Sequence, residues 1–129
     1  MRLLLDSHTL IWAVDDPSKV TLTVMVLLQN AANELLLSTA TIWEIAIKVA
    51  KGNLPLSLPY RPWMDKAIAD LDLPILPITL DHAERQIGLP FHHRDPFDRL
   101  LAAQALIEGV PLASADPIFD AYGVNRIWN

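Results

Sequence analysis

Cysteine is absent from the 129-residue chain. A disulfide framework and a thiolate metal site are therefore excluded, and any metal ion must be held by oxygen or histidine ligands. Long apolar runs are also missing, since none approaches the roughly 18 residues that span a bilayer. The N-terminal stretch MRLLLD places an acid directly after three leucines, which leaves too short an apolar core for a signal peptide. We therefore expect a cytoplasmic protein without a membrane partner.

Basic residues are in the minority, with 10 Lys and Arg against 15 Asp and Glu, and the formal net charge is -5. A protein that binds nucleic acid unaided usually has a basic surface, so this balance argues mildly against such a protein. A metal-dependent nuclease remains compatible with it, because clustered acids are needed there and bound cations offset part of their charge. The length of the chain indicates a single domain, 1–129, with no room for a second.

The clearest local signals lie in the stretch HHRDPFDRLLAAQALIEGVPLASAD. Asp95 before Pro96 predicts a helix start, because an aspartate caps free N–H groups and proline is tolerated at the first helical position. Apolar residues follow at helical spacing until Gly109, which predicts a left-handed stop. The segment Val110–Ser114 is typical of a short buried strand. Asp116 then stands before another proline and repeats the helix-start signal.

Strand and helix signals alternate along the chain. Arg2–Leu5 is apolar on both faces, which is typical of a central parallel strand covered by helices. The segment Lys19–Ala32 is rich in β-branched residues, but its length favours a helix, and we interpret it as one. The alternation predicts an α/β fold with a mainly parallel sheet flanked by helices. We further expect strands at Glu34–Ser38 and, at the sheet edges, 74–79 and 124–128; helices at Ser7–Val14, 40–51, 61–71 and 81–87; and loops at 53–59 and 89–94.

Four acids occupy the same kind of position, just past a strand or early in the helix that follows it. In open α/β sheets this edge binds ligands, so we expect the four carboxylates to converge. Three of them also have a purely structural explanation. Asp6 is the hardest to explain in that way, because an acid directly after a buried strand is costly unless it is paired or binds a cation. Glu44 could instead form a capping box with Thr41. Asp98 could serve merely to favour the helix dipole, and Asp116 could serve merely as a helix cap. In chain order, the acids are Asp6, Glu44, Asp98 and Asp116.

Ligands that are all oxygen atoms select a hard cation, Mg²⁺ or Mn²⁺, and such ions commonly act on phosphates. A metal in such a site polarises a phosphoryl oxygen and stabilises the leaving oxygen. Phosphodiester hydrolysis is therefore the leading reaction class.

Other polar and aromatic residues give weaker signals. His92 and His93 could touch a substrate phosphate, although solvated loop histidines are more common. His8 could face the pocket or the solvent. Arg94 and Arg99 could bind phosphate, orient a site acid or form surface ion pairs. The four tryptophans are expected to anchor the core or an interface rather than form a stacking platform: Trp12, Trp43, Trp63 and Trp128.

Four segments follow one another along the chain: LLLDSHTLIWAV, STATIWEIAIK, RDPFDRLLAAQA and PLASADPIFDAYGV. Together they resemble the PIN-domain ribonucleases, specifically the VapC-type toxins of type II toxin–antitoxin pairs, over essentially the whole chain. The resemblance implies that the four acids fall on the metal-binding acids of the family, with Ser114 as the hydroxyl partner of Asp116. It also implies that Asp95 is a helix cap, while Ser7 keeps the hydroxyl of a threonine that is frequent in the family.

The resemblance further implies Mg²⁺ or Mn²⁺ dependence, endonucleolytic cleavage of RNA, homodimer formation and neutralisation by a small cognate antitoxin. Two alternatives remain open. A Mg²⁺-dependent aspartyl phosphotransfer enzyme also has an aspartate after its first strand, but the segment after Asp6 lacks a second nearby carboxylate. A catalytically decayed PIN-like module could serve only for binding, although four intact acids argue against decay.

Overall fold

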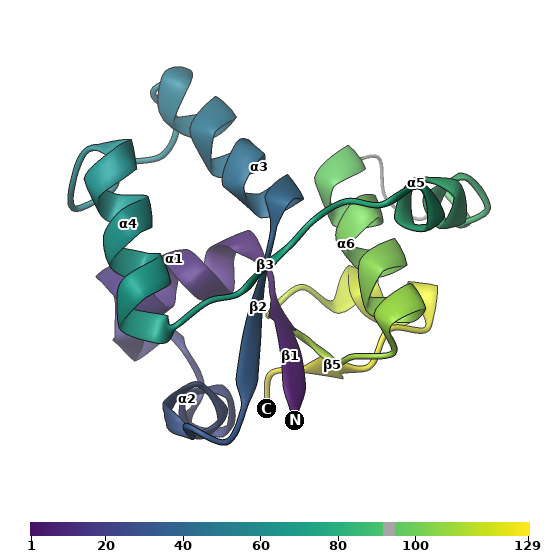
Figure 1. Ribbon diagram of the computed structural model, residues 1–129, viewed down its shortest axis with the longest axis horizontal. Helices are drawn as coiled ribbons and strands as arrows, with labels where there is room; N and C mark the ends of the chain where they lie inside the picture. The colour runs from purple at the N-terminus through teal and green to yellow at the C-terminus, as the bar shows by residue number, and fades with distance from the viewer. Residues whose placement is uncertain (92–94) are drawn as a thin grey trace.

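A computed structural model describes residues 1–91 and 95–129, so the loop residues His92, His93 and Arg94 of our prediction lie outside the described residues. A five-stranded sheet in the order β3-β2-β1-β4-β5 forms the centre of the molecule (Figure 1). Every strand pair in it is parallel, which confirms the predicted sheet and the central place of β1. The strands are β1 (Arg2–Leu5), β2 (Glu34–Ser38), β3 (Ile75–Leu76), β4 (Leu112–Ala113) and β5 (Arg126–Ile127).

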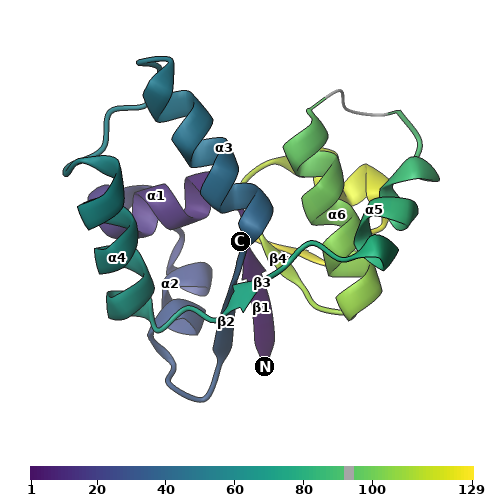
Figure 2. The same ribbon diagram turned by 45° about the horizontal axis from the view of Figure 1, so that its top comes forward.

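Helices cover both faces of this sheet (Figures 1 and 2). On one face, Leu3 packs with Leu10 and Trp63 in a core that α1, α2, α3 and α4 share. On the other face, Leu4 packs with residues of α6 and η2 such as Leu101 and Phe119. The helices are α1 (Ser7–Asp15), η1 (Pro17–Lys19), α2 (Leu22–Gln29), α3 (Thr39–Ala50), α4 (Tyr60–Leu71), α5 (Leu80–Ile87), α6 (Pro96–Glu108) and η2 (Pro117–Tyr122).

Helix boundaries follow the capping signals of the sequence closely. The side chain of Asp95 accepts hydrogen bonds from the N–H groups of Phe97 and Asp98 and so starts α6. Gly109 ends α6 with φ 65, in the left-handed region that glycine adopts at no steric cost. The helix interpretation of the segment 19–32 is confirmed, but α2 is shorter than expected because Thr21 caps it.

Three predicted strands are shorter in the structure than in the prediction: the one expected at 124–128 pairs only at Arg126–Ile127, and two more have a proline beside them. The expected strand 74–79 pairs only at Ile75–Leu76, and it does lie at a sheet edge as predicted. The expected strand Val110–Ser114 pairs only at Leu112–Ala113. Prolines stand beside both short strands, at Pro77 and Pro111, and a proline has no N–H group to extend a strand ladder.

In residues 1–91 and 95–129, no helix is long and apolar enough to cross a membrane.

Asp15, at the end of α1, holds the segment before α4 against the core. It accepts hydrogen bonds from the Ser57 N–H (3.0 Å), the Ser57 hydroxyl (2.6 Å) and the Trp63 indole N–H (3.0 Å). Partial burial works to raise the pKa of Asp15, but these hydrogen bonds outweigh it and hold the pKa below its ordinary value. The ionised carboxylate therefore stabilises the fold.

We predict that Asp15→Asn lowers the free energy of unfolding by on the order of 1 kcal/mol near pH 7. A lowered pKa contributes stability that is present above the ordinary pKa near 4 and is lost as the pH falls through the folded-state value. The deficit should therefore shrink below about pH 4, in urea unfolding at pH 7 and pH 3. Asp16→Asn, at the neighbouring half-exposed acid that pairs with Ser18 and Lys19 at the surface, should change little. An equal deficit for Asp15→Asn at both pH values would contradict this account.

Candidate active site

Asp6 lies where β1 ends and α1 begins, and it is buried. One of its carboxylate oxygens accepts a hydrogen bond from the Thr9 N–H at 2.8 Å, which makes it the cap of α1. The other oxygen accepts a hydrogen bond from the Ser114 hydroxyl, just past β4. Because β1 and β4 are parallel neighbours, the fold brings these two residues together although 108 positions separate them in the chain.

Asp116 joins this group through the same serine. Its N–H group donates to the Ser114 hydroxyl oxygen at 3.1 Å, while its own carboxylate caps η2 through the Ile118 N–H at 3.0 Å. Arg126 lies beside it and donates to the Ser114 carbonyl at 3.2 Å. The pKa of Arg126 is raised, first by its hydrogen bond to Asp120 and also by the negative charge of Asp116. Ser114 therefore connects two of the predicted site acids at one edge of the sheet.

Glu44 lies in α3, which begins where β2 ends, and its side chain is only 3% exposed. The capping-box alternative is wrong, because Ser38 caps α3 by accepting from the Ala40 N–H, so Thr41 already lies inside the helix. One carboxylate oxygen of Glu44, Oε2, pairs with Lys48 Nζ at 2.8 Å. The other, Oε1, is buried and has no hydrogen-bond partner in the described part of the chain. A buried carboxylate oxygen in this state is costly, and a bound cation is one way to satisfy it.

Lys48 is surrounded by negative charge. Burial works to lower its pKa, but the hydrogen bond and charge of Glu44 outweigh it and raise the pKa. Asp95 and Asp98, in the first turn of α6, add to this increase. Lys48 thus pairs directly with Glu44, and the negative charges of Asp95 and Asp98 also act on it.

A groove of about 440 Å³ lies beside this group. Its walls come from α3 and the residues after it on one side, and from the start of α6 on the other. Next to the groove, Trp43 is 65% exposed and meets Phe97 edge to face with ring centroids 6.2 Å apart. The lining residues are Glu44, Ile47, Lys48, Lys51, Asn53, Asp95, Pro96 and Phe97.

The four predicted site acids form two groups. Asp6 and Asp116 meet at Ser114, while Glu44 pairs with Lys48, on which the charge of Asp98 also acts. Among residues 1–91 and 95–129, no three histidine, aspartate or glutamate side chains are arranged to hold a metal ion. Carboxylates repel one another when no cation lies between them, so side chains without a metal are expected to separate in this way. The backbone places their helices at the same end of the sheet, while the side chains pair with Ser114 and Lys48.

The residues present fit a hard divalent cation in their chemistry. All the candidate ligands are carboxylates, which Mg²⁺ and Mn²⁺ prefer, and the unpaired Oε1 of Glu44 is an oxygen that such an ion would satisfy. Asp6, Glu44, Asp98 and Asp116 are the residues that would hold the ion, with the Ser114 hydroxyl orienting Asp6.

The burial or exposure of a side chain decides between the roles suggested for some of the residues with weaker sequence signals. Arg99 is not a surface or phosphate-binding residue, because it is buried and donates to the carbonyl groups of Gln86, Leu89 and Pro90. Its guanidinium therefore holds the chain after α5 in place. His8 is exposed, with its ring 5.6 Å from that of Trp12.

Ser7 is buried at the first position of α1. Its hydroxyl role stays a prediction. Trp63 is fully buried and confirms the expected core anchor, whereas Trp43 is largely exposed.

Sequence reasoning missed Lys48 and Arg126. The signal for Lys48 was available, because a glutamate and a lysine four residues apart on a helix face each other. No local signal indicated Arg126, whose position depends on the pairing of β4 with β5.

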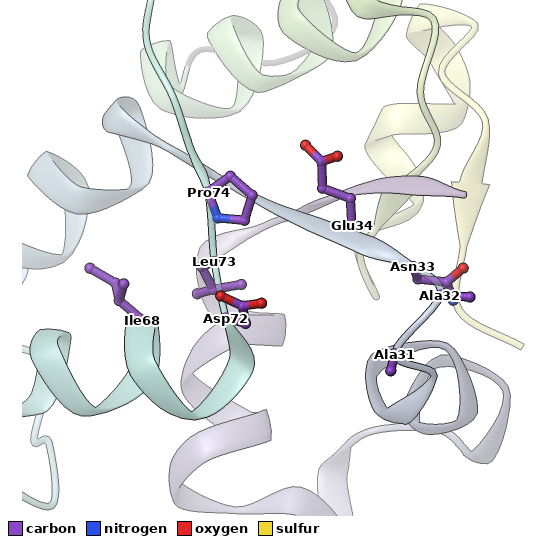
Figure 3. A pocket seen from close by; sticks show the side chains of 8 residues that line it. All are labelled: Ala31, Ala32, Asn33, Glu34, Ile68, Asp72, Leu73 and Pro74. Atoms are coloured by element: carbon purple, nitrogen blue, oxygen red, sulfur yellow. The ribbon is translucent and has the colours of Figure 1, made fainter.

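Another hollow, of about 480 Å³, lies at the opposite end of the sheet. Figure 3 shows its lining, which comes from Ala31–Glu34, at the turn into β2, and from Ile68 of α4 with the residues that follow this helix, Asp72–Pro74. In open α/β sheets ligands bind at the carboxyl ends of strands, and this hollow lies at the other ends. It is therefore separate from the candidate active site.

The chain is similar to a known family in sequence and to solved structures in fold. The sequence matches the family described as PIN domain over residues 3–125. A chain of the VapBC2 complex of Rickettsia felis, bound to a DNA fragment from its promoter, superposes with a TM-score of 0.73 at 17% identity, with 100% of each chain covered. A chain of FitAcB from Neisseria gonorrhoeae gives 0.66 at 21% identity, with 98% of this chain and 96% of that chain covered. DNA-bound VapBC from Salmonella typhimurium gives 0.70 at 16% identity, with coverages of 98% and 97%. The search of curated proteins found no match.

Proposed function

The chain belongs to the PIN-domain family, a family of nucleases, and from this premise we propose that it is a metal-dependent endoribonuclease, the VapC-type toxin of a type II toxin–antitoxin pair. One observation carries the proposal: Glu44 keeps a buried carboxylate oxygen without a hydrogen-bond partner in residues 1–91 and 95–129. Glu44 stands on α3, which begins where β2 ends, and Asp6 and Asp116 meet at Ser114 just past the ends of β1 and β4, at the same end of the parallel sheet. An active site that binds Mg²⁺ or Mn²⁺ explains why the fold retains this oxygen of Glu44.

A bound Mg²⁺ or Mn²⁺ would polarise a phosphoryl oxygen and neutralise the negative charge that develops at phosphorus. The protein supplies rigid ligands for it. Asp6 is fixed by the Thr9 N–H and the Ser114 hydroxyl, so it stays in one orientation. Glu44 is fixed on the middle of α3, and Asp98 on the first turn of α6, where the helix dipole favours a carboxylate.

RNA is the proposed substrate. The groove beside Glu44 carries Lys48, Lys51 and Asn53, which can donate hydrogen bonds to phosphate oxygens. Incubation with RNA and DNA oligonucleotides of the same sequence, each with chelator and with Mn²⁺, tests this proposal. We expect internal cuts in RNA with Mn²⁺ only. Intact RNA in the presence of Mn²⁺, or equal cutting of DNA, would contradict it.

The proposed protein partner is a small cognate antitoxin. The support for it is the shared fold with chains of the VapBC and FitAB complexes. An acidic site of this kind would attract a basic side chain of the partner, so we expect inhibition to weaken as salt rises.

We also propose a homodimer, because apolar side chains are exposed around α5. Leu80 is 89% exposed, Ile87 is 72% exposed and Phe91 is 84% exposed, and exposed apolar side chains that gather on one face mark interaction sites. Leu80 and Ile87 stand two helical turns apart, on one side of α5. This face would pack against its copy in a symmetric pair.

Light scattering at micromolar concentration should give the mass of a dimer for the wild type. The double variant Leu80→Lys and Ile87→Lys should give the mass of a monomer, because each lysine would be buried in the interface without a partner. Val26→Lys, at an exposed apolar position on α2, is the matched control and should stay dimeric. A monomeric wild type would exclude the dimer, and a dimeric double variant would exclude this face.

A further inference from the structure

Lys48 supplies the positive charge of the Glu44 group. Its ammonium lies 2.8 Å from Oε2 of Glu44, whose side chain is 3% exposed, while its own side chain is 36% exposed at the groove. The charges of Asp95 and Asp98 also act on this ammonium. A buried carboxylate is costly without a counter-charge, and Lys48 is the cation that provides it here.

We propose that Lys48 is the built-in counter-ion of the metal-free site and that a divalent ion displaces it from Glu44. This inference rests on the proposed function, because it assumes that Glu44 is a metal ligand. Lys48 is then a positioning residue: it keeps the acids in place until the metal arrives, and it competes with the metal for Glu44.

The chemistry of lysine suits this exchange. Its ammonium is a compact charge on a flexible stem, so it can leave one carboxylate and turn toward the solvent or the groove at little cost. A divalent ion and an ammonium repel each other, and the repulsion is strong where burial lowers the dielectric constant. Each therefore weakens the binding of the other to Glu44, although the two oxygens of the carboxylate differ in their partners. The unpaired Oε1 of Glu44 shows that Lys48 satisfies only half of this carboxylate within the described residues.

The test is a calorimetric titration of the full-length protein with Mn²⁺. Lys48→Met removes the competitor, and we expect the dissociation constant for Mn²⁺ to fall about tenfold, a change typical of losing one close charge. The melting temperature without metal should also fall, because Glu44 loses its counter-charge. Lys48→Arg keeps the charge and should bind Mn²⁺ as weakly as the wild type or more weakly.

Lys51→Met is the matched control, because Lys51 lines the same groove and its loss changes the net charge equally. It should alter the dissociation constant far less than Lys48→Met. Should Lys48→Met fail to fold, Lys48→Gln removes the charge while keeping a hydrogen-bond donor. The double variant Glu44→Gln with Lys48→Met should lose the tightening, since the contested ligand is gone.

Unchanged or weaker Mn²⁺ binding by Lys48→Met would overturn the proposal, because it would assign Lys48 a neutral or supporting role toward the metal. Equal tightening by Lys51→Met would also overturn it, since a general charge effect would then explain the result. A wild type that binds no Mn²⁺ would remove the metal site itself. Absence of Mn²⁺ binding would contradict the proposed function as well. The two outcomes for Lys48→Met and Lys51→Met would overturn only the role of Lys48.

Discussion

Asp98→Asn is expected to lower the rate of RNA cleavage by on the order of a thousand-fold, the loss expected when a metal ligand that contributes about 4 kcal/mol is removed. The substitution keeps the size of the side chain and leaves the helix cap untouched, because Asp95 makes the capping hydrogen bonds to the Phe97 and Asp98 N–H groups. The circular dichroism spectrum should therefore stay unchanged.

Asp95→Asn provides a stringent control for this prediction. It removes the same charge from the same helical turn, and asparagine caps helices as well as aspartate does. Its cleavage rate should stay within about a factor of ten of the wild type, since its loss is that of one nearby charge. Full activity in Asp98→Asn, or equal losses in the two variants, would remove Asp98 from the site. Asp6→Asn should behave like Asp98→Asn, because asparagine can still accept the hydrogen bond from the Thr9 N–H.

Thermal melts should show a second large effect, the stabilisation of the wild type by metal. An ion that binds only the folded state stabilises it by about 2.7 kcal/mol at one hundred times its dissociation constant. For a chain of this length, that corresponds to a rise in melting temperature on the order of 10 °C. Asp98→Asn should gain little, because one of its ligands has lost its charge.

The metal-free proteins should differ much less. Asp98→Asn removes repulsion between carboxylates, but it also removes the attraction of Asp98 for Lys48. We therefore expect the two metal-free proteins to agree within about 1 kcal/mol. If Asp98 only stabilised the helix dipole, the variant would be less stable with and without Mn²⁺ and would gain as much from the metal as the wild type. Melts of both proteins with chelator and with excess Mn²⁺ distinguish these cases.

Those parts of the fold that depend on neighbouring residues could be predicted from the sequence. Asp95 and Asp116 start helical segments as expected, Gly109 ends one, and the apolar β1 is central. Each of these features follows from capping chemistry or from a short apolar pattern. The order of strands and helices also predicts a parallel sheet, in which the carboxyl ends of all strands lie at one edge.

Features that depend on tertiary packing could not be predicted. Gln104 is a polar residue of α6, yet it is fully buried and accepts a hydrogen bond from the Ser38 hydroxyl, 66 positions away, at 2.6 Å. His82 is likewise buried, 3.0 Å from Glu108 across 26 positions. Arg99 has the spacing of a surface residue but is buried against backbone carbonyl groups. Periodicity gives the direction of a side chain on its own element, but not which distant group it meets.

The site itself was predictable in part. The position of each acid relative to a strand end is local information, and the structure places Asp6 and Asp116 at one serine. The pairing of Glu44 with Lys48 follows from a four-residue spacing on one helix, but it was not among the predictions. The separation of the four acids into two groups depends on the balance of charges around them, which a sequence pattern does not express.

The Mn²⁺ dependence of RNA cleavage tests the central claim most directly. Purified protein is mixed with end-labelled RNA at increasing Mn²⁺ concentrations, and the rate of internal cutting is compared with the calorimetric occupancy of the same sample. We predict that cleavage is absent in chelator and reaches half its maximum at the concentration that half fills the site. Cleavage in chelator, or a filled site without cleavage, would contradict the assignment of these acids as a metal-dependent ribonuclease site.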